Sequence, residues 1–227
     1  MHIPDGYLGP ATSGAFYAVM VPLWVAASRI VKKTLKAKQV PLLAIGAAFS
    51  FVIMMFNVPI PGGSTGHAVG GVLVAILLGP WAALIAITVA LVIQALLFGD
   101  GGITAIGANC FNMATVIPFV GYYTYRLIAG PGQAASNRRT IAAFIAGYVG
   151  INVAALCAGV EFGLQPHLCR TAAGQALYCP YGLRIAVPAM TVGHLLVFGW
   201  VEALVTALVV KYLQKQAPEM LGQEGRQ

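Results

Sequence analysis

The chain has 227 residues, of which 59% are hydrophobic and only 8% are charged, and its mean hydropathy is +0.83. Water-soluble domains carry about 25% charged residues, so this composition excludes an ordinary soluble domain, a disordered chain and a nucleic-acid-binding module. The net charge is +7. In a membrane protein, the positions of the positive residues along the chain indicate its orientation in the bilayer. We therefore expect one compact all-α domain embedded in a lipid bilayer.

Seven apolar stretches, separated by Gly, Pro and charged residues, predict membrane-spanning helices. They cover residues 10–31, 40–57, 68–79, 81–98, 103–128, 140–164 and 185–210. The third stretch is too short to cross the hydrocarbon core by itself. The third and fourth stretches could therefore form one long helix that runs through Gly79 and Pro80. These lengths leave a choice between six and seven helices.

The basic residues favour seven helices. With seven helices and the N-terminus outside, all Lys and Arg residues except Arg170 and Arg184 fall on one side, whereas six helices divide them almost equally. Positive residues collect on the cytoplasmic side of membrane proteins, so we expect an outer N-terminus and a cytoplasmic C-terminus. Residues 1–215 are then a single integral-membrane domain, and residues 216–227 form a cytoplasmic tail.

The first helix does not have the pattern of a cleaved signal peptide. Signal peptides carry positive residues before their apolar core, whereas here nothing basic precedes Arg29 and a basic cluster follows the core. We therefore expect Met1 to persist in the mature protein.

Three non-helical segments meet on the outer side in this topology: residues 1–6, 57–67 and 99–102. The second is rich in Pro and Gly. Irregular backbone at membrane depth is tolerated only where protein or a cavity surrounds it, so this segment predicts a loop folded into the helix bundle. Such a loop would carry His67 inward.

A histidine at position 2 has a specific metal chemistry. The α-amine of Met1, the deprotonated amide nitrogen of His2 and Nδ1 of the same residue form two fused chelate rings, and His67 is the natural fourth ligand. Square-planar nitrogen coordination indicates Ni(II) or Cu(II). The amine and the amide must lose their protons, so binding should release protons and weaken in acid. Either histidine alone is more often incidental, and the residues by themselves leave that alternative open.

These segments resemble the CbiM/NikM family, the substrate-binding membrane subunits of energy-coupling-factor transporters for nickel and cobalt. The resemblance rests on Met-His-Ile-Pro-Asp-Gly at the N-terminus, on the run from Asn57 to His67, and on residues 78–81, 94–102 and 107–113. It covers roughly residues 1–215 and implies a six-helix core with an added N-terminal helix, whose amino terminus inserts into the core. The implied metal ligands are Met1 through its amine, His2 through its amide and imidazole, and His67.

The resemblance also implies a function and partners. The chain would be a non-enzymatic subunit in the cytoplasmic membrane of a prokaryote, taking up Ni²⁺ in preference to Co²⁺, which stays a close alternative. Its partners would be a transmembrane coupling subunit, two cytoplasmic ATPases and a small accessory membrane protein. No P-loop occurs in the sequence, so ATP hydrolysis must come from those partners.

Four polar residues are candidates for supporting the ligands: Ser64, Asp100, Asn109 and Asn112. The two asparagines lie three apart on one helix face, where they could bond the ligand loop, orient His67 or join two helices. Asp100 either draws cations toward the mouth of the site or is a solvated turn residue.

Other polar residues leave their roles open. His194 and Glu202 lie inside the last span, where ionisable residues are functional candidates, and neither has an obvious partner. His167 is a candidate outer ligand in the longest outer loop. In the same loop, Cys169 and Cys179 either form a disulfide or remain free thiols. Whether this loop adds a lid or a capture site is open.

Two other functions compete with metal uptake. Residues 62–66 match G-x-S-x-G, the motif of a serine hydrolase, which would use Ser64 as nucleophile; but that motif works as a strand-to-helix turn, and here it joins two membrane helices. A substrate subunit for an organic vitamin is the second alternative. It should have a roomy aromatic outer pocket in place of an N-terminal chelate.

Overall fold

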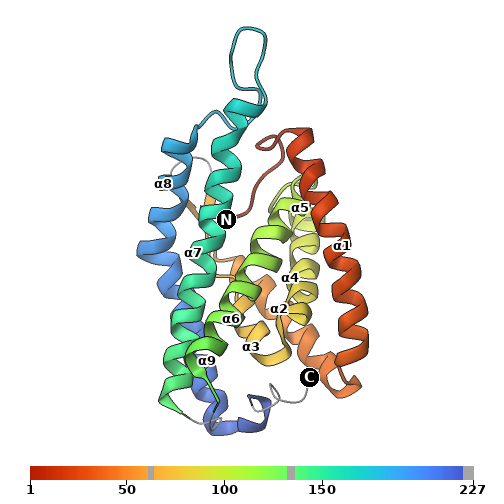
Figure 1. Cartoon of the computed structure of the whole chain (residues 1–227), viewed down its shortest axis with the longest axis vertical. Helices are drawn as coiled ribbons and strands as arrows, with labels where there is room; N and C mark the ends of the chain where they lie inside the picture. The colour runs from red at the N-terminus through yellow and green to blue at the C-terminus, as the bar shows by residue number, and fades with distance from the viewer. Residues whose placement is uncertain (61–63, 132–135, 222–227) are drawn as a thin grey trace.

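The computed structural model describes residues 1–60, 64–131 and 136–221, and most of them are helical. The helices run along the long axis of an elongated bundle (Figure 1). They are α1 Pro10–Thr34, α2 Val40–Met54, α3 Gly71–Leu78, α4 Pro80–Ile93, α5 Ile106–Asn109, α6 Ile117–Ala129, α7 Asn137–Leu168, α8 Leu183–Gly193 and α9 Gly199–Gln216. Short 3₁₀ turns precede α2 at Ala37–Gln39 and follow α9 at Pro218–Met220.

Three π-helical turns continue or join these helices. Gln94–Phe98 extends α4, Cys110–Val116 joins α5 to α6, and His194–Phe198 joins α8 to α9. Five helical runs are long and apolar enough to cross a membrane: Pro10–Thr34, Ala37–Met54, Pro80–Phe98, Asn137–Leu168 and Leu183–Gln216. The chain is therefore an all-α, multi-pass membrane protein, as expected. The short α3 and the α5–α6 run are not among the five, so the count of seven crossings stays a prediction.

The break at Gly79 and Pro80 separates two helices. Gly79 ends α3 with φ 85°, a backbone conformation that favours glycine, and Pro80 opens α4 at its first position. The single long helix through this point is therefore wrong. The third helix begins at Gly71 and not at residue 68, because Gly70 has a left-handed backbone, with φ 74°, and residues 68–70 form no helix or strand. Another element lies before them.

That element is a small β-hairpin. β1 (Val58–Ile60) pairs antiparallel with β2 (Ser64–Gly66), with Val58 opposite Gly66 and Ile60 opposite Ser64. The segment was expected to be a loop, and this was wrong because paired strands satisfy backbone groups that a membrane interior leaves without water. Its expected direction is confirmed, since His67, the next residue, is only 1% exposed.

Helix α7 packs against its neighbours through glycine. A Cβ at Gly147 would lie 3.0 Å from Cα of Ala203 in α9, and one at Gly159 would lie 3.0 Å from Cα of Val187 in α8. Small residues let membrane helices approach until their backbones touch. This packing places α8 and α9 against α7, with α8 in contact with β1 (Val58–Ile60), a short strand.

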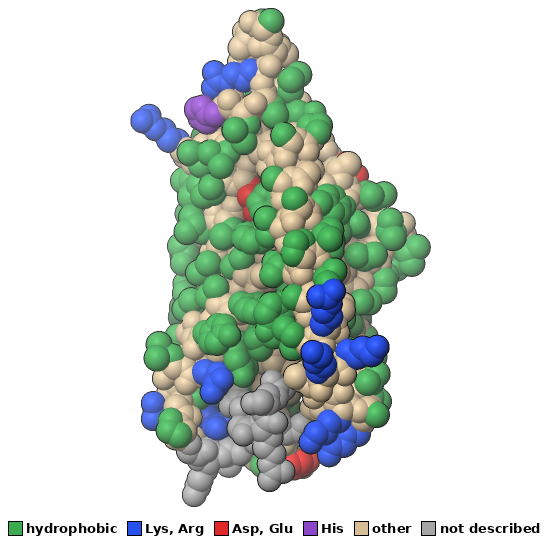
Figure 2. Space-filling model, turned by 45° about the vertical axis from the view of Figure 1, so that its right-hand side comes forward, with side chains coloured by type: hydrophobic (Ala, Val, Ile, Leu, Met, Phe, Trp, Pro, Cys, Tyr) green, Lys and Arg blue, Asp and Glu red, His purple; other side chains and the backbone are tan. Residues whose placement is uncertain are grey.

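Charged side chains are concentrated at one end of the molecule. Figure 2 shows a broad apolar belt and, below it, most of the visible Lys and Arg side chains. Lys32 and Lys33 end α1, and Arg126 lies in the last turn of α6. The cytoplasmic assignment of this end rests on the distribution of positive charge and stays a prediction.

Candidate metal centre

The N-terminal segment turns back from the start of α1 into the middle of the bundle (Figure 1). Met1 and Ile3 are fully buried, and His2 is 4% exposed. The α-amine of Met1 donates hydrogen bonds to the backbone oxygen of Thr65 and, at 3.1 Å, to its Oγ1. The amine therefore lies against the β-hairpin, two residues before His67.

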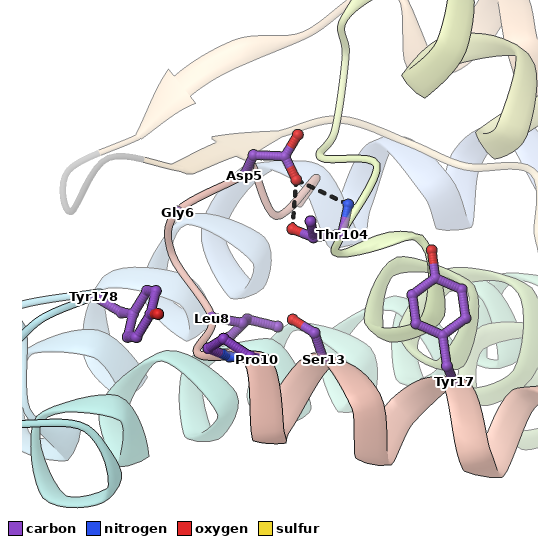
Figure 3. Close-up of a pocket in the computed structure, with 8 residues that line it drawn as sticks. All are labelled: Asp5, Gly6, Leu8, Pro10, Ser13, Tyr17, Thr104 and Tyr178. Atoms are coloured by element: carbon purple, nitrogen blue, oxygen red, sulfur yellow. Dashed lines mark hydrogen bonds between the residues drawn. The ribbon is translucent and has the colours of Figure 1, made fainter.

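Polar contacts hold this segment at a defined depth. Asn109 Oδ1 accepts the N–H of Ile3 at 2.8 Å, and its Nδ2 donates to the oxygen of Ile3 at 3.1 Å. Asp5 accepts the backbone N–H groups of Ile103 and Thr104 at 3.1 and 2.9 Å. Figure 3 shows Asp5 bonded to Thr104 at the rim of a cavity of about 470 Å³ that Tyr17 also lines. Because both ends of the segment are pinned, Met1 and His2 have little freedom to slide.

The rings of His2 and His67 lie next to each other at this depth, tilted relative to one another. Their centroids are 4.6 Å apart and their planes make an angle of 31°. His67 Nδ1 lies 3.0 Å from the oxygen of Ala68, to which it donates, while its Nε2 is buried without a hydrogen-bond partner among the described residues. His2 Nε2 lies 3.2 Å from Gln94 Oε1, and His2 Nδ1 has no hydrogen bond there, although Asp100 Oδ1 is 3.5 Å away. The two ring nitrogens without hydrogen bonds are those that the N-terminal chelate requires.

Burial keeps these nitrogens neutral. It lowers the pKa of the Met1 α-amine from 8.0 to about 4, although the nearby Asp100 carboxylate acts in the opposite direction. Burial and the neighbouring amino terminus lower the pKa of His2 to about 3, and the same two causes hold the pKa of His67 well below 6.5. Burial raises the pKa of Asp100, while the amino terminus opposes this. Near pH 7 the amine and both imidazoles therefore carry free lone pairs, the form that binds a metal ion.

A conventional side-chain metal site is absent from the part of the chain that the structure describes: no three His, Cys, Asp or Glu residues cluster suitably there. The arrangement offers instead one amine, one backbone amide and two imidazoles. Such a nitrogen set suits a metal ion that accepts a deprotonated amide.

The other predicted residues divide into two groups. Asn109 and Asp100 lie at the centre: Asn109 holds the N-terminal segment and not His67, and Asp100 also accepts a hydrogen bond from Asn57 at 3.3 Å. Asn112 lies elsewhere, because its Nδ2 donates to Glu161 Oε2 on α7 at 2.9 Å. Of the roles open for Asn112, the structure shows the contact between helices.

Ser64 takes part in the hairpin. It lies in β2 opposite Ile60, and its side chain is outside the described residues. A serine-hydrolase nucleophile sits on a strand-to-helix turn, whereas Ser64 lies within a strand. The backbone therefore departs from that motif.

Two supporting residues were missed or misread from the sequence. Gln94, which contacts His2, was assigned no role. For Glu202 the sequence shows no obvious partner, and the structure supplies one: its carboxylate accepts the N–H groups of Val69 and Gly70 at 2.7 and 2.9 Å. Glu202 thus holds the backbone that follows His67. In both cases the available signal was a polar residue inside an apolar helix.

The end of α7 carries His167, and the long loop after α7 contains two cysteines. Cys169 and Cys179 are free thiols, which settles the disulfide question against a bond. His167 is exposed and contacts Arg170 at 3.4 Å. The end of the loop supports the N-terminal segment, because the N–H of Cys179 donates to the oxygen of Tyr7 at 3.1 Å.

Comparison with curated proteins shows long, close similarity. The chain is 55% identical to a probable fused nickel transport protein, LarMN, of Lactiplantibacillus plantarum, over 98% of this chain and 67% of that protein. It is 54% identical to the fused nickel transport protein NikMN of Rhodobacter capsulatus, over 97% and 64%. A putative metal transport protein of Methanocaldococcus jannaschii is 50% identical over 100% and 97%. The chain thus spans about two thirds of the fused relatives and nearly all of the third.

Solved structures and a family model agree with this similarity. A crystal structure of a truncated transition metal transporter has a TM-score of 0.91 and 56% identity, covering 95% of this chain and 99% of that one. A second transition metal transporter has a TM-score of 0.91 and 54% identity, covering 99% of both. The model described as the cobalt uptake substrate-specific transmembrane region matches residues 2–220. The chain therefore belongs to the CbiM family.

Proposed function

We propose that the chain is the substrate-binding membrane subunit of an uptake system for a divalent transition metal, Ni²⁺ in preference to Co²⁺. The observation that carries this proposal is the pairing of His2 and His67, whose rings lie 4.6 Å apart and each present a buried nitrogen without a hydrogen-bond partner among the described residues. Relatives named for nickel transport and, in Thermosipho melanesiensis, for cobalt transport support the same class of substrate.

The proposed ligands are the α-amine of Met1, the amide nitrogen and Nδ1 of His2, and Nε2 of His67. These four nitrogens would form a square plane, which favours Ni²⁺ because pairing its eight d electrons there gains ligand-field energy. Gln94 and Asn109 would fix the orientation of the His2 ring and the depth of the segment, as supporting residues do around metal ligands.

Energy for uptake would come from partner proteins. The sequence contains no P-loop, so we propose a transmembrane coupling subunit, two cytoplasmic ATPases and a small accessory membrane protein as partners. The two relatives named as fused proteins extend beyond the region matched here, which supports a further module in the same system. The basic end of the bundle would face the cytoplasm of a prokaryote, with the N-terminal segment outside.

Metal analysis of the purified chain tests this proposal. The chain is offered equal concentrations of nickel and cobalt, washed, and analysed for both metals. We expect one ion per chain, mainly nickel, with the yellow-orange colour and diamagnetism of a square-planar nitrogen site. Failure to retain either metal would refute the function, and a paramagnetic six-coordinate spectrum would refute the square plane.

A further inference from the structure

A third buried imidazole lies next to the candidate centre without a role in it. His194 is fully buried and begins the π-helical turn between α8 and α9. Its Nδ1 donates to the oxygen of Met190 at 2.7 Å, and its Nε2 has no hydrogen-bond partner among the described residues. A buried ring nitrogen without a hydrogen bond has lost its hydration without compensation, and its lone pair is free to bind a ligand.

The hairpin that carries His67 packs on the turn that carries His194. A side chain at Gly66 would collide with the ring of Phe198, and the ring centroid of Phe198 is 5.3 Å from that of His194. On the other strand, Ile60 Cγ2 lies 3.5 Å from the position of a Cβ at Gly193. His194 therefore lies beside the strand that ends at Gly66, directly before His67.

The π-helical turns support a functional placement of His194. Such turns are rare and occur often at functional sites. The turn Gln94–Phe98 begins with the residue that contacts His2, and the turn Cys110–Val116 directly follows Asn109, which holds Ile3. The third π turn in the described part of the chain begins with His194.

We propose that His67 and His194 form a second site for the transported metal, with Nε2 of each ring as its ligands. The proposal rests on the proposed metal uptake. Both rings donate their Nδ1 proton to a backbone oxygen, at Ala68 and Met190, which is the arrangement that orients histidine ligands toward a metal ion.

The second site would take the ion as the N-terminal chelate opens. His67 belongs to both sites, so the ion keeps one ligand while the bonds to Met1 and His2 break and a bond to His194 forms. The amide nitrogen of His2 takes back a proton from water in the same exchange. Two neutral imidazoles hold a divalent ion less tightly than a fused chelate, and this suits a site from which the ion is released.

Nickel binding by chains without the first site tests this inference. His2→Ala removes the imidazole from the chelate, and we expect a weaker residual affinity that rests on His67 and His194. Adding His194→Ala should lower this residual affinity by more than the roughly 10–100-fold that loss of a supporting residue costs. The matched control adds Thr206→Val, which removes a buried hydroxyl of α9 that has no partner among the described residues, and the residual affinity should stay the same. Thermal melting in detergent checks that each chain is folded.

The outcomes separate this inference from the proposed function. If the unaltered chain binds neither nickel nor cobalt, the function itself fails; if it binds only cobalt, the same variants are compared with cobalt. If the unaltered chain binds nickel but His2→Ala has no residual binding, or binds equally well with and without His194→Ala, the second site is refuted. In the otherwise unaltered chain, His194→Ala should slow uptake in cells more than it weakens binding; a loss of binding as severe as that of uptake would place His194 in the first site and also refute the inference.

Discussion

Two non-helical segments lie at the same end of the molecule, one buried in the helix bundle and the other exposed. Residues 1–8 turn into the bundle, whereas residues 170–178 project away from it (Figure 1). Met1 and Ile3 are fully buried, and side chains from distant helices hold their backbone. Residues 170–178, the outer segment, are mostly exposed. Their backbone bonds within the segment, where the N–H of Thr171 donates to the oxygen of Gln175 at 2.8 Å.

The difference lies in where the backbone finds its hydrogen-bond partners. The outer segment reaches water, so it needs no help from the helices. The backbone of Met1–Ile3 and that of Val69 and Gly70 are buried, and they depend on Asn109 and Glu202, polar residues that are costly inside a membrane helix. Polar residues in apolar spans therefore mark the helices that support the centre.

The largest effect should come from lengthening the buried segment. Two extra Gly residues before Met1 turn its α-amine into a peptide nitrogen, move the free amine too far from His2 to complete a fused chelate, and add atoms at a buried position beside Thr65. We expect such a chain to lose nickel binding and uptake completely. Binding by the purified chain, and uptake in cells with the partner subunits, measure this.

A tag after Gln227 is the matched control and should have no effect. Full uptake by a chain that keeps an N-terminal extension would contradict the amine ligand and leave only the two imidazoles.

Removal of His67 should have the next largest effect. His67→Ala deletes the fourth nitrogen while leaving Glu202 to hold the backbone at Val69, so the chain should fold and yet bind nickel weaker by orders of magnitude. Calorimetry on the purified chain measures the affinity, and thermal melting checks the fold. Equal affinities for the two chains would remove His67 from the centre.

A pair of asparagines separates support of the centre from helix packing. Asn109→Ala removes both hydrogen bonds to Ile3, and we expect nickel affinity to fall about 10–100-fold, as for other residues that support metal ligands. Asn112→Ala is the matched control, since its partner is Glu161. It should lower thermal stability without changing affinity. The reverse pattern would show that the N-terminal segment does not need Asn109.

Much of the fold could be predicted because its signals are local. Apolar stretches and the Gly79-Pro80 break locate the helices, and the Pro-Gly run places His67 inside. The hairpin was missed because strands of three residues, one of them containing Pro59, have no periodic pattern to detect. The π turns were missed because local unwinding depends on side-chain contacts that form only in the folded bundle.

The sequence indicated the proposed ligands and, in Asn109, one residue that holds the N-terminal segment, but it did not indicate Gln94 or the partner of Glu202. His2 next to a free amine has a local chemical meaning, which a sequence displays directly. The contact of Gln94 with His2 joins residues 92 positions apart, and the contact of Glu202 with Val69 joins residues 133 apart. Only the packing of helices brings such pairs together, so the sequence indicated that Glu202 was unusual without indicating its partner.

The effect of pH should be smaller than the sequence alone suggests. An amine with its usual pKa would release a proton on binding nickel, in addition to the amide proton of His2. Because burial lowers the pKa of the amine to about 4 and that of His2 to about 3, both are already neutral near pH 7. Nickel affinity should therefore fall only about tenfold for each unit of decreasing pH, the effect of one proton. Calorimetry in buffers of different ionisation enthalpy counts the protons, and a count of two would contradict the neutral amine.

The smallest effect should come from the exposed outer segment. His167 lies at the surface, and its ring contacts Arg170, while other elements hold the candidate metal centre. We expect His167→Ala to leave nickel affinity unchanged in the purified chain, because an exposed side chain with one weak contact contributes little to the fold. Uptake at low nickel concentration is the sharper measurement, since a capturing ligand would matter most when the ion is scarce. If His167→Ala slows uptake at low nickel concentration while affinity is unchanged, the outer segment captures the ion first and the N-terminal segment binds it afterwards. Both segments would then take part in uptake, at different steps.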